Sequence, residues 1–112
     1  MYFTRPKRIN ANIAISAKTI GSLSSYRGTA INISTTGILV KFQKEIPFKK
    51  GGSIIEVNCT HNNNRMKFLC KLIRESEDGT KGLSIIQIDE SDLVNWNQMI
   101  ISLINKEEKE SK

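Results

Sequence analysis

Residues 28–42 read GTAINISTTGILVKF and predict two strands that are joined by a polar turn. The candidate inward-facing residues have opposite parity on the two sides of that turn: Thr29, Ile31 and Ile33 before it, and Ile38, Val40 and Phe42 after it. Because neighbouring side chains of a strand point to opposite faces, this change means that the chain turns or bulges between Ser34 and Gly37. Gly37 is able to take a positive φ at that point.

Two-residue alternation of apolar and polar residues predicts four further strands around this pair. The first begins near Asn10 and runs to about residue 18, and its inward parity is that of Ile9, Ala11, Ile13, Ile15 and Ala17. Residues 21–26 form a loop before the next strand. Later strands are expected over residues 54–60, 66–74 and 82–88, with an Asn62-Asn63-Asn64 hairpin tip between the first two and an Asp78-Gly79 turn before the last.

The hydrophobic period changes to that of a helix over residues 91–105. Apolar residues recur there at helical spacing, namely Leu93, Trp96, Ile100 and Leu103. We expect Trp96 to anchor this helix in the core, because its ring buries a large apolar area when it is enclosed. The mixed-charge residues 106–112 are expected to fray.

Six short strands and one helix predict an all-β fold, a six-stranded antiparallel β-barrel, closed or nearly closed, with a C-terminal α-helix. Closure removes exposed strand edges, and the helix can plug one open end of the barrel. A chain of 112 residues fits a single domain, 1–112. The expected organisation is a flexible N-terminal arm over residues 1–9, a barrel over 10–88, a helix over 91–105 and a frayed tail over 106–112.

The charge of the chain is divided unequally along its length. The net charge is +6, but residues 1–74 hold thirteen Lys or Arg against two acidic residues, whereas residues 75–112 hold four against nine. No acidic residue precedes Glu45. A positive field of this kind attracts phosphates, whether they belong to a nucleic acid, a membrane surface or a small nucleotide.

The sequence gives no support for an enzyme or for a metal site. His61 is the only histidine, and no loop of the oxyanion type precedes Cys59 or Cys70. A C-x₁₀-C spacing with one histidine lacks the paired ligands of a zinc site. The phosphate-loop signatures are absent as well, so no cofactor is expected.

The two cysteines and the hydropathy of the sequence indicate the cellular compartment of the protein. A turn at Asn64-Arg65 would make Cys59 and Cys70 direct cross-strand neighbours, although buried reduced thiols are the expected state. No run of about 18 apolar residues is present, and the N-terminus lacks the features of a secretory signal. The expectation is therefore a cytoplasmic protein with no membrane insertion.

Two segments have the chemistry of a binding site for an anionic guanine nucleotide. The first is the basic cluster TRPKR at residues 4–8, whose guanidinium groups can form paired hydrogen bonds to phosphate or to guanine O6 and N7. The second is NISTTG at residues 32–37, which offers the Asn32 amide, the Ser34 hydroxyl and backbone N–H groups near Gly37. Together they predict a pocket on one face of the barrel.

The order of these segments resembles the PilZ family. An arginine motif precedes the first strand, N-x-S-x-x-G lies between strands two and three, and a helix follows the last strand. The segments FKKGGSIIEV and KGLSIIQID also resemble the family's later strands. The resemblance runs from Arg5 to about Ile104. It implies a receptor domain for cyclic di-GMP, a bacterial second messenger, that acts through a partner protein on motility, exopolysaccharide output or virulence.

The resemblance also implies which residues hold the nucleotide. Asn32, Ser34 and Gly37 match the family's [D/N]-x-S-x-x-G element, and Arg8 matches the second arginine of its R-x-x-x-R element. The first arginine of that element falls on Thr4, with an arginine one residue later. The expected ligand-binding residues are therefore Arg5, Lys7, Arg8, Asn32, Ser34 and Gly37.

Two other functions remain open at this stage. One is a PilZ-like adaptor that acts by protein contact without nucleotide. The other is a small barrel that binds RNA or single-stranded DNA, which suits the basic half of the chain. Such surfaces stack bases on aromatic side chains, and three of the seven aromatic residues here, Phe42, Phe68 and Trp96, have internal positions in the strand and helix patterns. Nucleic acid is therefore the less favoured partner.

Overall fold

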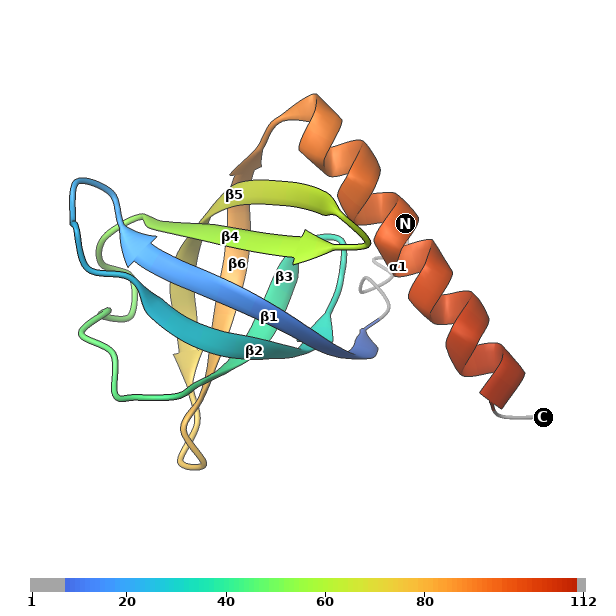
Figure 1. Cartoon of the computed structure of the whole chain (residues 1–112). Coiled ribbons are helices and arrows are strands. Elements are labelled where there is room, and N and C mark those ends of the chain that lie inside the picture. The colour runs from blue at the N-terminus through green and yellow to red at the C-terminus, as the bar shows by residue number, and fades with distance from the viewer. Residues whose placement is uncertain (1–7, 111–112) are drawn as a thin grey trace, which may run out of the picture.

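The computed structural model describes residues 8–110 of the chain. Six strands precede one helix: β1 (Ile9–Thr19), β2 (Tyr26–Ile33), β3 (Gly37–Phe42), β4 (Ile55–His61), β5 (Asn64–Glu75), β6 (Thr80–Ile88) and α1 (Glu90–Glu110). All strand pairs are antiparallel, and the sheet closes in the order β1-β2-β3-β6-β5-β4 (Figure 1). The predicted all-β barrel with a C-terminal helix is confirmed.

The interior of the barrel is filled by alternate residues of its strands. In β1, Ile9, Ile13, Ile15 and Ala17 are buried and Ala11 is half-buried, so the predicted parity of this strand is correct. In β4, Ile55, Val57 and Cys59 have the same role. Inward side chains of this kind leave the intervening residues on the outer face of the barrel, where they meet solvent or a partner.

The predicted inward face of β2 is correct at Ile33 and wrong at Thr29 and Ile31. Ala30 and Ile33 are buried, whereas Thr29 and Ile31 are only half-buried. The pairing of β2 with β3 shifts between Ala30 and Asn32, which marks a β-bulge at Ile31. A bulge places two residues of one strand opposite one residue of the other, so it reverses the parity of everything beyond it.

The hairpin between β4 and β5 turns at two asparagines. His61 pairs with Asn64, and the residues between them, Asn62 and Asn63, have positive φ angles of 50° and 67°. Two left-handed residues in succession are the conformation of a type I′ hairpin turn, which asparagine adopts more readily than most residues. The predicted tip of this hairpin therefore lies at the expected place.

This register separates the two cysteines. Cys59 pairs with Met66 and Cys70 pairs with Ile55, so the cross-strand pairing considered for a turn at Asn64-Arg65 does not occur. Both thiols are free and buried. Burial raises the pKa of Cys59 from 9.0 to about 11, with a smaller contribution from the Asp92 carboxylate, and it raises the pKa of Cys70 to about 12.

We expect neither thiol to be alkylated by iodoacetamide in the folded chain at mildly alkaline pH. The thiolate is the nucleophile, and a raised pKa leaves almost none of it until the pH approaches the values above. Mass spectrometry after a short pulse of reagent measures the modification. The same chain in concentrated urea is the control, in which both cysteines should react; equal rates in the two conditions would contradict the prediction.

The helix α1 lies across one end of the barrel, beside the β4–β5 hairpin (Figure 1). Trp96, Met99 and Ile100 are buried, and the ring of Trp96 lies 5.0 Å from that of Phe68. The predicted anchoring role of Trp96 is confirmed. The helix is longer than the predicted 91–105, since it begins at Glu90 and continues to Glu110, so residues 106–110 of the expected tail are helical.

Candidate functional site

The turn between β2 and β3 is built on Ser34, which is itself buried. Its hydroxyl oxygen accepts hydrogen bonds from the backbone N–H groups of Thr36, at 3.3 Å, and Gly37, at 3.2 Å. Its own N–H donates to the carbonyl oxygen of Gly37 at 2.9 Å. The hydroxyl therefore holds the turn in shape, as serine side chains commonly do in turns of this size.

Gly37 is required by a close contact and not by its backbone angles. The described glycines with positive φ are Gly21, Gly51 and Gly79, so the expected positive φ at Gly37 is not found. A Cβ atom at Gly37 would instead lie 2.8 Å from the carbonyl oxygen of Leu83 on β6. Gly37 therefore lets β3 approach β6 closely at the base of the turn.

Asn32 lies just before the turn, between two strands. Its backbone pairs with Asn10 of β1 and with Leu39 of β3. The side-chain oxygen Oδ1 is buried and has no hydrogen-bond partner among the described residues. A buried acceptor without a partner costs free energy and is rare in native proteins, so this atom is suited to accept a bond from a ligand.

The strand register brings Arg8 to the same end of the barrel. Ile9 pairs with Ile33, Arg8 immediately precedes Ile9, and Ser34 immediately follows Ile33. In an antiparallel pair these two residues therefore flank one end of the same ladder. Arg8 is exposed, and it forms no ion pair among the described side chains. Arg5 and Lys7 lie outside the described residues.

A buried hydrogen bond connects the turn to α1. The indole N–H of Trp96 donates to the carbonyl oxygen of Ser34 over 3.0 Å. The helical pattern around Trp96 does not indicate this bond, although a buried tryptophan N–H usually has an acceptor, so one could be expected. The helix is thus attached directly to the element that carries Asn32 and Gly37.

Two further observations concern the chemistry of the described chain. Among residues 8–106, whose side chains the structure describes, no three His, Cys, Asp or Glu side chains gather as metal ligands do. Over the described residues 8–110, no helix has the length and apolar character needed to cross a membrane.

The family model of the PilZ domain matches residues 3–105. The chain belongs to the PilZ domain family. PilZ domains are ligand-binding and effector domains. No curated protein sequence matches this PilZ domain.

Solved structures agree with this fold at low sequence identity. The PilZ domain of YcgR from Escherichia coli with c-di-GMP has a TM-score of 0.76 and 13% identity, over 96% of each chain. The PilZ domain of CeSA from a cellulose-synthesizing bacterium has a TM-score of 0.71 and 16% identity, over 87% of this chain and 97% of the other. The Bacillus subtilis inhibitor of motility MotI has a TM-score of 0.73 and 14% identity, over 97% of this chain and 53% of its own.

Proposed function

We propose that this PilZ domain is a receptor for cyclic di-GMP, and that it passes the signal to a partner protein in the cytoplasm. The observation that supports the proposal is the Ile9–Ile33 pair, because Arg8 directly precedes Ile9 and the Ser34–Gly37 turn directly follows Ile33. The unpartnered Asn32 oxygen just before that turn supports it independently. The buried free cysteines support the cytoplasmic location, since that compartment keeps thiols reduced.

The chemistry of the ligand fits these groups. Cyclic di-GMP carries two phosphates and two guanines, and an arginine can bind a phosphate, or guanine O6 and N7, with two parallel hydrogen bonds. Arg5 and Lys7 are proposed to add positive charge from the segment before β1. The Asn32 oxygen is proposed to accept a hydrogen bond from the exocyclic amine of a guanine. Ser34 and Gly37 give the turn the shape that presents Asn32.

We expect Arg8→Ala to weaken cyclic di-GMP binding by roughly 5- to 150-fold, the loss that one charge-assisted pair of hydrogen bonds implies. Isothermal titration calorimetry of the wild type and the variant measures it. Lys49→Ala removes the same charge from an exposed residue of the segment between β3 and β4, and it should leave the affinity unchanged. Equal binding by the wild type and Arg8→Ala would overturn the assignment of Arg8.

A second candidate function is a PilZ adaptor that acts by protein contact without nucleotide. Thr4 favours it, because the family's first arginine falls on this position and threonine cannot supply a guanidinium group. Absence of heat with cyclic di-GMP at high micromolar concentration, in a chain shown to be folded by circular dichroism, would select the adaptor over the receptor.

A further inference from the structure

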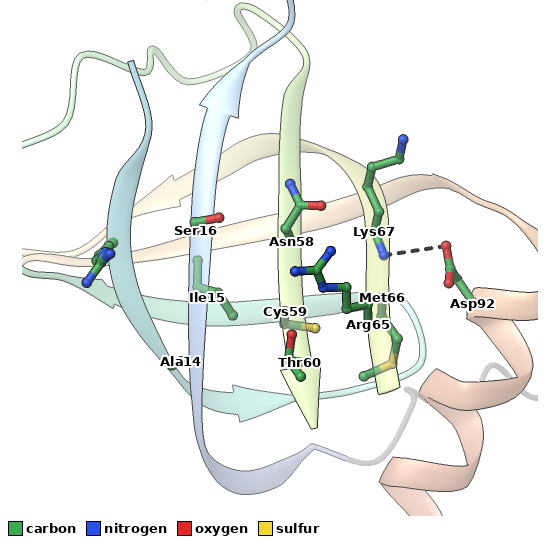
Figure 2. Close-up of a pocket in the computed structure, with 11 residues that line it drawn as sticks. Ala14, Ile15, Ser16, Asn58, Cys59, Thr60, Arg65, Met66, Lys67 and Asp92 are labelled. Atoms are coloured by element: carbon green, nitrogen blue, oxygen red, sulfur yellow. Dashed lines mark hydrogen bonds between the residues drawn. The ribbon is translucent and has the colours of Figure 1, made fainter. Parts of the chain in front are cut away.

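A groove of about 770 Å³ runs over the outer face of β2, β1, β4 and β5, away from the Asn32–Gly37 turn (Figure 2). One row of cross-strand partners crosses it: Ser16 of β1 pairs with Arg27 of β2 on one side and with Asn58 of β4 on the other, and Asn58 pairs with Lys67 of β5. Adjacent strands lie about 4.8 Å apart, so the path around the barrel surface from the backbone of Arg27 to that of Lys67 is about 14 Å long.

The floor of this groove is neutral and its walls are basic. The two central strands contribute short or uncharged side chains, namely Ala14, Ser16, Asn58 and Thr60. The two outer strands contribute Arg27 on one wall and Arg65 with Lys67 on the other. In Figure 2 the guanidinium group of Arg65 reaches over β4 toward Asn58. The arrangement places positive charge on both sides of a low polar floor.

The two arginines of the walls have no local counter-ion. Among the described side chains, neither Arg27 nor Arg65 forms an ion pair. The nearby Glu56 carboxylate is shared by two lysines, with oxygen–nitrogen distances of 3.6 Å to Lys18 and 3.8 Å to Lys67. Asp92, at one end of the groove, accepts a hydrogen bond from the backbone N–H of Lys67 at 3.4 Å. The excess charge of the groove is therefore positive and lies on the arginines.

These features favour an acidic protein segment as the occupant. No aromatic side chain lines the groove, and surfaces that hold nucleotides or single strands rely on aromatic stacking. The described strands pair all the way round the barrel, so a partner cannot add a strand to a free edge and has to be recognised by side chains. Carboxylates match the arginine fork, and two of them on one segment can reach both walls.

The groove is separate from the proposed nucleotide site. Arg27 lies seven residues before Ser34 along the β2 direction, which corresponds to roughly 20 Å of strand. Ala14 lies six residues beyond Arg8 along β1, a similar distance. A segment bound in the groove would leave the Asn32–Gly37 turn open.

We propose that the outer face of β2, β1, β4 and β5 is a docking surface for an acidic segment of a partner protein, with Arg27 and Arg65 as the anchoring residues. The proposal rests on the partner protein of the proposed function, and it states where that partner binds and that its binding segment is acidic. It does not need bound nucleotide, so it can fail or succeed separately from the receptor assignment.

A fluorescein-labelled peptide of alternating Glu and Ser is the probe, and fluorescence anisotropy at low salt measures its affinity. The double variant Arg27→Glu with Arg65→Glu is expected to bind at least about tenfold more weakly than the wild type. Lys49→Glu with Lys50→Glu makes the same change of net charge on the exposed segment between β3 and β4, and is expected to bind within about twofold of the wild type. Circular dichroism verifies folding, and Arg27→Gln with Arg65→Gln replaces the reversal variant if that one unfolds.

Three results would overturn the proposal. Equal losses in the two double variants would show a response to net charge alone, and no loss in the arginine variant would exclude the groove. If oligothymidylate binds more tightly than the peptide, and if the arginine double variant loses that binding too, the face is a nucleic-acid surface and not a protein-docking surface. Cyclic di-GMP titrated into the arginine variant is expected to bind as it does to the wild type. If cyclic di-GMP binds neither the wild type nor the arginine variant, the receptor assignment fails, but the result with the peptide is still valid.

Discussion

Trp96→Ala is expected to lower the free energy of unfolding by about 3–5 kcal/mol, the usual cost of truncating a large buried aromatic side chain. Trp96 is 1% exposed and packs against Phe68 between α1 and the open end of the barrel. Its removal leaves a cavity there and deletes the hydrogen bond to Ser34. Domains of this size are stable by only about 5–15 kcal/mol, so the loss is a large part of the total.

Urea denaturation followed by far-ultraviolet circular dichroism measures this effect, since Trp96 is the sole tryptophan and fluorescence is lost with it. Trp96→Phe separates the two contributions in part, because it keeps much of the aromatic packing and removes the N–H donor together with a small part of the ring system. It leaves the buried Ser34 carbonyl without that donor, at a cost of about 1–3 kcal/mol. Wild-type stability of Trp96→Phe would mean that the hydrogen bond contributes nothing.

Trp96→Phe also tests whether α1 holds the proposed nucleotide site in shape. The Ser34 carbonyl belongs to the turn in which the Ser34 hydroxyl accepts hydrogen bonds from the N–H groups of Thr36 and Gly37. Trp96→Phe should therefore weaken cyclic di-GMP binding, whereas Met99→Leu, a buried packing change on the same helix, should not. Equal affinities of the two variants for cyclic di-GMP would mean that the shape of the turn depends on the barrel and not on the hydrogen bond from α1.

The sequence predicted most of the fold because one physical signal, alternation, is strong in these strands. Ile9 to Ala17 keep a single parity, and the structure buries that face. In β2 the same signal gave Ile33 correctly but Thr29 and Ile31 wrongly, because the bulge at Ile31 reverses the parity within the strand. The predicted change of parity across the turn, between Ile33 and Ile38, is found as well. A bulge depends on pairing with a neighbouring strand, which a single strand's sequence does not report.

The residues of the candidate site could be named from the sequence, and they stay a prediction; the structural role of each described residue could not be predicted. Asn32, Ser34 and Gly37 were chosen as one element, and the structure gives them different tasks: an open acceptor, a brace for the turn and a close contact with β6. The bond from Trp96 spans 62 residues of sequence. The basic groove arises only when Arg27 and Lys67 are set into register through β1 and β4. The close contact of Gly37 and the groove depend on which strands are neighbours, and the bond from Trp96 depends on where the helix packs.

Gly37→Ala is expected to destabilise the chain by about 1–3 kcal/mol, the range found when an extra group is forced into a packed site. The added Cβ would lie 2.8 Å from the Leu83 carbonyl oxygen, which is backbone and cannot rotate away. The strands β3 and β6 must then separate at the point where Gly37 pairs with Ser84. Urea denaturation measures the loss, and Thr35→Ala, an exposed change in the same turn, is the matched control.

A third variant, Gly37→Asn, separates the close contact from a requirement for unusual backbone angles. If glycine were needed for a left-handed conformation, asparagine would be tolerated better than alanine, because it adopts that conformation more readily. If glycine is needed because β3 approaches β6, asparagine brings the same Cβ and a larger side chain, and it should be at least as destabilising as alanine. Since the Gly37 N–H donates to Ser34 and its carbonyl accepts from it, displacement of β3 also reshapes the turn. Both substitutions should therefore weaken cyclic di-GMP binding along with stability, and a variant that lost stability while binding as the wild type does would separate the turn from the proposed site.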